Sequence, residues 1–243
     1  MNFFRKNFHY KELDSSSTFI KRRRSFLKNL TFVSCDYQTS GHGRLGRTWS
    51  SNKGENLTFS FIIKDKTIIK KLNGLSLLIG VCIFNALNTF SLPNLSMKWP
   101  NDVYVGDKKI CGILLESIIG ENNDNCVIVG VGINVNQTEF NGEFNAQPTS
   151  IKLETNKTLD IKKFKKSVYK IIKKELKLYK KDKSDFIKTF NQNNYLSGKL
   201  VYANIDNKVV QVKCLNVNNN GTLKVIYNKE EKEVSSGEIT FHV

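Results

Sequence analysis

The chain has 243 residues, of which 40% are hydrophobic and 25% charged, and its formal net charge at pH 7 is +16. This hydrophobic share is sufficient for a packed core and argues against a disordered chain. The basic balance indicates either an acidic partner, such as a nucleotide, a nucleic acid, an anionic membrane or an acidic protein, or a lysine-rich surface in contact with solvent.

The N-terminal part of the chain predicts alternating helices and strands. Asp14 to Ser17 form a cap-like cluster, so we expect a helix over about residues 18–29, followed by a strand over residues 31–37. Apolar and polar side chains alternate in residues 56–63, which is typical of a strand. Residues 72–90 predict a largely buried helix, and their polar interruptions make them unsuited to cross a bilayer.

The middle of the chain predicts a run of strands and then a long helix. Strands are expected at residues 95–99, 103–105, 109–119 and 126–135. The first ends at Pro100, because proline has no backbone donor for a sheet, and the next two form a hairpin around Gly106 and Asp107. Apolar side chains then recur at three- and four-residue steps over residues 158–180, so we expect an amphipathic helix with a lysine-rich face, continued by a short helix over residues 185–192.

After residue 195 the sequence pattern changes from helices and longer strands to short strands and turns. Short strands separated by Asn, Asp and Gly turns are expected at residues 200–203, 209–215, 222–227 and 238–242. Such a segment predicts a compact β-barrel of the SH3 type. We therefore predict an α+β protein with a larger domain over residues 1–195 and a small β domain over residues 196–243.

The most distinctive motif is residues 41–47, Gly-His-Gly-Arg-Leu-Gly-Arg. Glycines let backbone N–H groups approach an anion, and arginines supply fixed charge and paired donors, so this loop predicts contact with a phosphate or carboxylate. Its G-x-G-x-x-G spacing also occurs in dinucleotide-binding loops. The residues that follow do not open the helix whose N-terminus would hold a pyrophosphate, so we reject that interpretation.

Other chemistries find little support in the sequence. Histidine occurs only at positions 9, 42 and 242 and no G-x-S-x-G element is present, which disfavours a Ser-His-Asp site. The five cysteines include no C-x-x-C pair, so we expect neither a protein-bound metal nor disulfides, as in a cytoplasmic protein. Magnesium carried by a nucleotide would need only one or two carboxylates. Arg44, Arg47 and Lys109 are candidates to offset phosphate charge. Trp49 or Trp99 is a candidate to stack on a base, unless the indole is simply core.

Several segments, in order along most of the chain, resemble the biotin protein ligases. Residues 38–49 match the family's loop, Q-x-x-G-R-G-R-x-G-R-x-W, and residues 98–102 are identical to its K-W-P-N-D element. Residues 108–116 and 130–136 look like its K-[LIV]-[AC]-G-[IL]-L-x-E and G-x-G-[IL]-N-x-N strands. Residues 237–239 fit the end of its small C-terminal domain.

The resemblance implies a mixed β-sheet with helices, like that of class II synthetases, and a small C-terminal SH3-like barrel. It also implies an activity. Biotin and MgATP form biotinyl-5′-AMP, and biotin then passes to one lysine of a biotin carboxyl carrier domain of a biotin-dependent carboxylase. Such a reaction brings a carboxylate and a triphosphate together, which requires concentrated positive charge. The ligands that the resemblance implies are biotin, ATP and Mg²⁺.

Position by position, the resemblance assigns the motif residues to one of two ligands. The residues expected at biotin are Ser15, Ser16, Ser17, Gln38, Gly41, His42, Gly43, Arg44 and Lys109. Those expected at ATP are Arg47, Trp49, Asn101 and Asn134. Arg44 and Lys109 are also expected to act in catalysis with Asp102, which would orient the reacting groups and assist the acceptor amine. The alternative for Asp102 is a turn cap after Pro100.

The chain departs from the family pattern at two places. Residues 14–17 read D-S-S-S where the family has D-S-T-N, which keeps small hydrogen-bonding groups but loses an amide. His42 stands where the loop usually has arginine, which removes one permanent charge. We therefore expect activity with an altered affinity or pH dependence.

Two alternative functions stay open. A lipoate or octanoyl transferase shares the implied fold, but its R-R-x-[ST]-G-G-G element is absent from the sequence. A DNA-binding regulator would suit the net charge, yet the residues before Asp14 are too few for a helix-turn-helix, so we expect a ligase without that domain. We expect no specific DNA partner, no membrane partner, and a monomer or homodimer.

Overall fold

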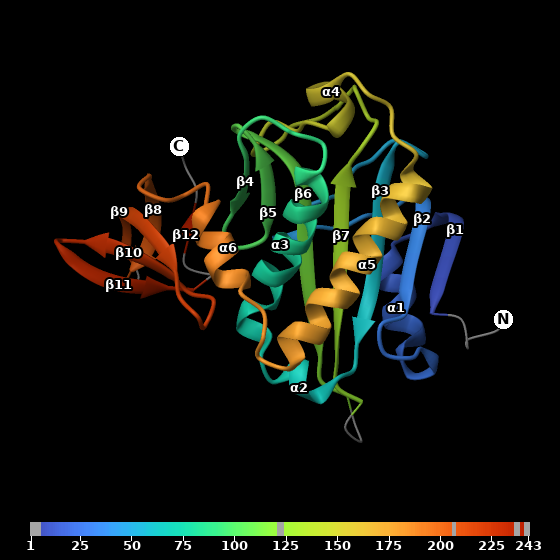
Figure 1. The fold of residues 1–243 in the computed structure, drawn as a ribbon, viewed down its shortest axis with the longest axis horizontal. Coiled ribbons are helices and arrows are strands. Elements are labelled where there is room, and N and C mark those ends of the chain that lie inside the picture. The colour runs from blue at the N-terminus through green and yellow to red at the C-terminus, as the bar shows by residue number, and fades with distance from the viewer. Residues whose placement is uncertain (1–5, 121–123, 206–207, 236–238, 241–243) are drawn as a thin grey trace.

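A seven-stranded sheet organises most of the chain (Figure 1). The structure, a computed structural model, describes residues 6–120, 124–205, 208–235 and 239–240. The strand order is β1-β2-β3-β7-β6-β5-β4; the β1–β2 pair is parallel and the other pairs are antiparallel. The strands are β1 (Asn7–Leu13), β2 (Phe32–Gln38), β3 (Asn56–Ile63), β4 (Leu95–Lys98), β5 (Asp102–Val105), β6 (Lys108–Ile118) and β7 (Cys126–Asn134).

Six helices accompany this sheet in the described residues, and four of them begin at side-chain caps. They are α1 (Ser16–Arg23), α2 (Lys66–Ile69), α3 (Leu75–Asn88), α4 (Ile151–Thr155), α5 (Ile161–Lys180) and α6 (Phe186–Gln192), with 3₁₀ turns η1 (Arg24–Phe26), η2 (Arg44–Gly46) and η3 (Leu72–Gly74). The side chains of Ser15, Asp65, Ser150 and Asp160 accept backbone N–H bonds in the first turns of α1, α2, α4 and α5, as N-caps do. No helix of the described residues is both long enough and apolar enough to cross a bilayer.

Alternation along β3 produces a different environment on each face of the sheet. Phe59 points to the face covered by the long helices α3 and α5, and its ring centroid lies 5.0 Å from that of Tyr169 on α5 (Figure 1). Ile62 points to the opposite face and packs against α1. Because neighbouring residues of a strand point to opposite faces, Thr58 and Ser60 share the α1 side. That side is apolar near Ile62 and polar further along the strand.

A second, smaller antiparallel sheet follows α6, and its order is β11-β10-β9-β8-β12. Its strands are β8 (Leu200–Ile205), β9 (Lys208–Val217), β10 (Leu223–Tyr227), β11 (Glu230–Val234) and β12 (Ile239–Thr240). Buried side chains of this sheet join the same apolar core as α3. Trp99, which is 1% exposed, donates its indole N–H to the Gly221 carbonyl at 3.0 Å. The two sheets are therefore joined through one apolar core and through the Trp99–Gly221 hydrogen bond.

The predicted mixed sheet with helices and a small C-terminal β segment is confirmed. The helix expected to reach residue 29 is wrong in length, because α1 ends at Arg23 and Leu30 takes a left-handed conformation, with φ of 58°. The bounds of β3 agree with the prediction. Among the described residues the structure adds two strands and two α-helices that the sequence did not predict, namely β1, β11, α2 and α4.

Two predictions at the C-terminal end have a more limited outcome. Of the strand expected at residues 238–242, Ile239–Thr240 is described and forms β12. Gly237 and Glu238, which carry part of the resemblance, lie outside the described residues. The division into domains at residue 195 stays a prediction.

Candidate active site

Glycines form part of one face of the large sheet, on the side where α1 packs. Asp102 of β5 pairs with Gly112 of β6. Gly112 in turn pairs with Gly132 of β7, which pairs with Thr58 of β3. We call this row of four residues the loop face, because the glycine–arginine loop lies against it. Since glycine has no side chain, a large group can approach the backbone between Asp102 and Thr58.

The indole of Trp49 takes up that space. A Cβ built on Gly132 would stand 2.2 Å from Trp49 Cε2, and one built on Gly112 would stand 3.1 Å from Trp49 Cζ3. Trp49 Nε1 is buried without a hydrogen-bond partner among the described residues. Trp99, the other candidate for stacking on a base, belongs to the core and bonds Gly221, so that alternative is wrong.

The glycine–arginine loop is itself a short hairpin. The backbone N–H of Trp49 donates to the Gly41 carbonyl at 2.9 Å, and that of Gly43 donates to the Arg47 carbonyl at 2.7 Å. At the tip, Leu45 and Gly46 have φ of 56° and 73°, which suits a type I′ turn. A Cβ on Gly41 would stand 2.5 Å from the Trp49 carbonyl oxygen, so this position requires glycine.

The three predicted catalytic residues come together beside the loop face. Lys109 Nζ lies 2.8 Å from Asp102 Oδ1, and both side chains are less than a third exposed. Arg44 reaches the same region from the loop, where its Nη1 donates to Asn101 Oδ1 at 3.1 Å. Burial lowers the pKa of Arg44, and the neighbouring Asp102 carboxylate opposes that shift. Two cations and one carboxylate from the loop, β5 and β6 thus meet at one site. Asp102 is the first residue of β5, and its side chain forms an ion pair with Lys109.

The predicted serine cluster lies at the start of α1 and is buried. Ser15 Oγ caps the helix and lies 2.9 Å from Ser17 Oγ. Ser16 donates from both its backbone N–H and its Oγ to Gln38 Oε1, at 2.8 and 3.0 Å. Ser16 Oγ also lies 2.7 Å from Ser60 Oγ on β3. The structure therefore brings Ser16 and Gln38 together next to the loop face, and it adds Ser60, which the motifs had not identified.

His42 connects the loop to α1. Its Nε2 lies 3.1 Å from Thr18 Oγ1, and its backbone pairs with Thr48 across the hairpin. An imidazole hydrogen-bonded to a helix can hold the loop against α1. The residue that replaces the usual arginine is therefore a tether of the loop in this structure.

Asn134 and Arg47, both expected at the nucleotide, occupy different environments. Asn134 is 3% exposed, and its Nδ2 donates to the Thr149 carbonyl at 2.9 Å. The Thr149 N–H in turn donates to the Lys109 carbonyl at 2.9 Å. Asn134 thus supports the backbone that carries Lys109. Arg47 is exposed at the base of the hairpin tip. The pairing of Lys109 with this segment could not be found from the motifs, because it joins residues far apart in the sequence.

A sequence profile described as the biotin/lipoate A/B protein ligase family matches residues 10–134, just over half of the chain. The chain therefore belongs to this family. The biotin protein ligase from Aquifex aeolicus in complex with biotin and ATP has a similar structure, with a TM-score of 0.86 and 32% sequence identity. The match covers 98% of this chain and 99% of that one.

Two relatives match over shorter stretches. The bifunctional ligase/repressor BirA of Bacillus subtilis is 34% identical over 132 residues, which are 54% of this chain and 41% of that protein. The biotin--[acetyl-CoA-carboxylase] ligase of Paracoccus denitrificans is 29% identical over 143 residues, 57% of this chain and 59% of that protein. The match thus spans about two fifths of the length of the first relative and under two thirds of the second.

Proposed function

We propose that the chain is an ATP-dependent biotin protein ligase. It joins biotin to ATP as biotinyl-5′-AMP, with release of pyrophosphate, and then transfers biotin to a lysine of a biotin carboxyl carrier domain. The observation that carries this proposal is the convergence of Arg44, Lys109 and Asp102 beside the loop face. The likeness to a ligase whose structure holds biotin and ATP supports the choice of ligands.

In the first step, a biotin carboxylate oxygen attacks the α-phosphate of ATP and pyrophosphate leaves. Both reactants are negative, so cations fixed in place stabilise the charge that develops. Arg44 and Lys109 are placed for this, because one comes from the loop and the other from β6, and both lie near Asp102. Holding both reactants in one site also supplies part of the rate enhancement.

Magnesium that arrives with the triphosphate fits the residues present. Asp102 would supply at most one carboxylate, and no cluster of three metal-binding side chains occurs among the described residues, which suits an ion held mainly by the nucleotide. When bound, the ion would neutralise part of the phosphate charge.

In the second step, the acceptor lysine amine attacks the acyl carbon of the mixed anhydride, and AMP leaves. The amine must be neutral to attack, so a carboxylate beside the reacting carbon would orient it and receive its proton. Asp102 is the candidate for that role. Its ion pair with Lys109, in which Nζ lies 2.8 Å from Oδ1, fixes the orientation of the carboxylate.

The polar groups near α1 suit the ring of biotin. A ureido ring has N–H donors and a carbonyl acceptor, and the hydroxyls of Ser16 and Ser60 together with the Gln38 amide offer the complementary set. The Trp49 indole, packed on Gly132, would then lie beside the nucleotide. We assign biotin to the polar groups of Ser16, Ser60 and Gln38 near α1, and ATP to the part of the loop face on which Trp49 packs.

The test is transfer to a carrier domain. The full chain is incubated with MgATP, a biotin carboxyl carrier domain and either biotin or lipoate, and the carrier is weighed by intact mass spectrometry. We expect the mass of one added biotin, no addition to a carrier whose acceptor lysine is arginine, and strongly reduced addition by Lys109→Ala. Lipoyl transfer without biotinyl transfer would instead support the lipoate ligase alternative and overturn the proposal.

A further inference from the structure

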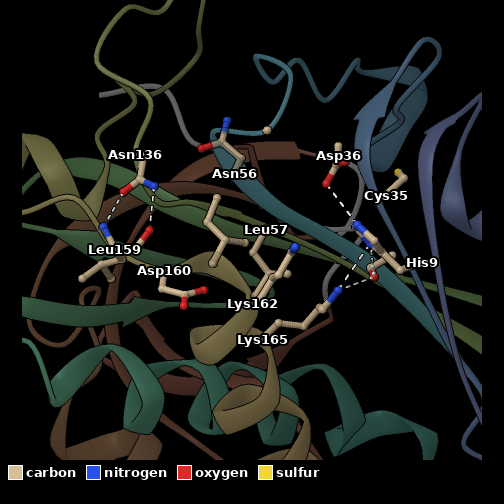
Figure 2. A pocket seen from close by; sticks show the side chains of 13 residues that line it. His9, Cys35, Asp36, Asn56, Leu57, Asn136, Leu159, Asp160, Lys162 and Lys165 are labelled. Carbon is tan, nitrogen blue, oxygen red and sulfur yellow. Dashed lines mark hydrogen bonds and ion pairs between the residues drawn. The ribbon is translucent and has the colours of Figure 1, made fainter.

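A separate cavity of about 430 Å³ lies between the β1–β2–β3 edge of the sheet and the first turns of α5 (Figure 2). His9 and Ser34 line it and are paired between β1 and β2. Ser34 is also paired with Phe59 of β3, whose ring packs on α5. The cavity is therefore on the sheet face opposite the loop face. Its volume is within the range of small-molecule sites.

Two lysines of α5 supply positive charge at this cavity. Lys165 Nζ donates to Ser34 Oγ at 3.1 Å and lies 3.3 Å from His9 Nδ1, and Figure 2 shows the Lys165 side chain directed toward His9. Lys162 also lines the cavity. Across the part of the chain that the structure describes, neither lysine forms an ion pair with a carboxylate. Burial lowers the pKa of Lys165, and the charge of the neighbouring Asp36 opposes that shift.

The two carboxylates at the cavity are already used by other groups. Asp36 Oδ1 lies 3.1 Å from His9 Nε2. Asp160 Oδ1 accepts the backbone N–H of Lys163 at 3.1 Å and caps α5. Neither carboxylate lies at ion-pair distance from Lys165 or Lys162 in the described part of the chain, so the two ammonium groups are placed to pair with an anionic ligand. A buried hydroxyl, Ser34 at 2% exposed, adds a further hydrogen-bonding group.

We propose that this cavity binds the phosphate group of a small polar molecule through Lys165 and Lys162, beside the His9 ring. A tetrahedral oxyanion would accept hydrogen bonds from the ammonium groups, as phosphate does in charge-assisted contacts. The remaining volume, which Leu57, Leu159 and Ile161 also line, would hold the rest of the molecule. This site does not depend on the proposed ligase chemistry, which lies on the other face of the sheet.

The experiment uses the full chain with sodium sulfate as the probe, because sulfate keeps a fixed charge where histidine titrates. The histidine ring signals are followed by NMR at constant ionic strength, and His9→Gln identifies the His9 signal. We expect a saturable shift of that signal with sulfate but not with chloride. Saturating biotin and ATP should leave the shift intact. Loss of the shift under those conditions would place the anion in the ligase site and overturn the proposal.

Matched charge variants complete the test. Lys165→Met and Lys162→Met should each weaken sulfate binding about tenfold or more, the effect expected for a lost charge-assisted hydrogen bond. Lys170→Met removes the same charge from an exposed site on the same helix and should bind sulfate as the parent does. Equal loss in all three variants would indicate general charge attraction and contradict the proposal. Lys162 is exposed, so its variant should fold even if Lys165→Met does not. Glycerol phosphate compared with inorganic phosphate then distinguishes an ester from the free ion.

Discussion

The indole of Trp49 lies against the backbone of Gly132 so closely that a Cβ at residue 132 would stand 2.2 Å from Cε2 and 2.4 Å from Cζ2. The glycine on β7 and the tryptophan on the loop therefore form one structural unit. Any side chain on Gly132 must move the indole, because the sheet backbone cannot yield. The position of the loop over the predicted nucleotide site depends on this contact.

We expect Gly132→Ala to displace Trp49 and to lower kcat/KM for ATP by about 10²-fold, since small displacements in a site are costly. The measurement is adenylate formation from biotin and ATP. Gly80→Ala in α3 is the matched control, because its Cβ would lie 3.8 Å from Ile113 Cδ1, an ordinary contact. It should retain activity. Unchanged activity in Gly132→Ala would contradict the assignment of Trp49 to the nucleotide.

Asp102→Asn should separate the two chemical steps. The amide keeps the shape of the carboxylate but cannot take a proton from the acceptor amine, so we expect transfer to slow by about 10²-fold while adenylate still forms. Rapid-quench single-turnover experiments measure both products in one reaction. If adenylate formation fell as much as transfer, Asp102 would instead serve mainly through its ion pair with Lys109.

Arg44→Gly should loosen the hairpin formed by the glycine–arginine loop. Arg44 Nη1 donates to Asn101 Oδ1 at 3.1 Å, which ties the hairpin to the turn before β5. Without this contact we expect more biotinyl-5′-AMP to escape into solution, measured by chromatography and by labelling of a protein that is not a carrier. Leu45→Gly is the control, because Leu45 is 85% exposed at the same tip and already has a left-handed φ. Equal escape from both variants would make loop flexibility, rather than Arg44, the cause.

The fold was predictable where a segment carries a clear sequence pattern of its own, such as a buried apolar run or a helix cap. β3 is buried along its whole length and has the predicted bounds, and α5 begins directly after its Asp160 cap. The strand β1 was missed although Phe8 and Tyr10 do pack near α1. Its apolar residues stand among basic ones, and the parallel partner β2 lies beyond α1 in the sequence, so nothing local indicates the pairing.

The site was predictable only as far as the motifs extend. They identify Lys109, Asp102 and Arg44, which the structure brings together. They do not reveal that Ser60 would meet Ser16 or that Asn134 would support the backbone next to Lys109. Those contacts depend on the register of the strands and on the segment around Thr149 that pairs with Lys109. A short stretch of sequence predicts neither of these.

Trp99→Phe tests the junction between the two sheets. The change removes the hydrogen bond to the Gly221 carbonyl and leaves a small void, so we expect the free energy of unfolding to fall by about 2–3 kcal/mol. Urea unfolding followed by circular dichroism measures this loss. Because both sheets share one apolar core, the parent should unfold in a single transition. Two separate transitions in the parent would show that the small sheet is independent and that Trp99 does not couple it to the large one.

His9→Gln tests how the charges of Lys165 and Asp36 act on His9 of β1. Burial first, and the Lys165 ammonium second, lower the pKa of His9 below its ordinary value, while Asp36 opposes them. The unfolded chain then binds a proton on His9 more readily than the folded chain does. The contribution of neutral His9 to the free energy of unfolding is therefore fully present above pH about 6.5, and it is lost as the pH falls through the lower pKa that His9 has in the folded chain. We expect the Tm difference between the parent and His9→Gln to shrink from pH about 7.5 to about 5 in sulfate-free buffer. Comparing the two proteins cancels the titration of carboxylates that both contain. Parallel Tm curves would mean that His9 titrates as it does in the unfolded chain.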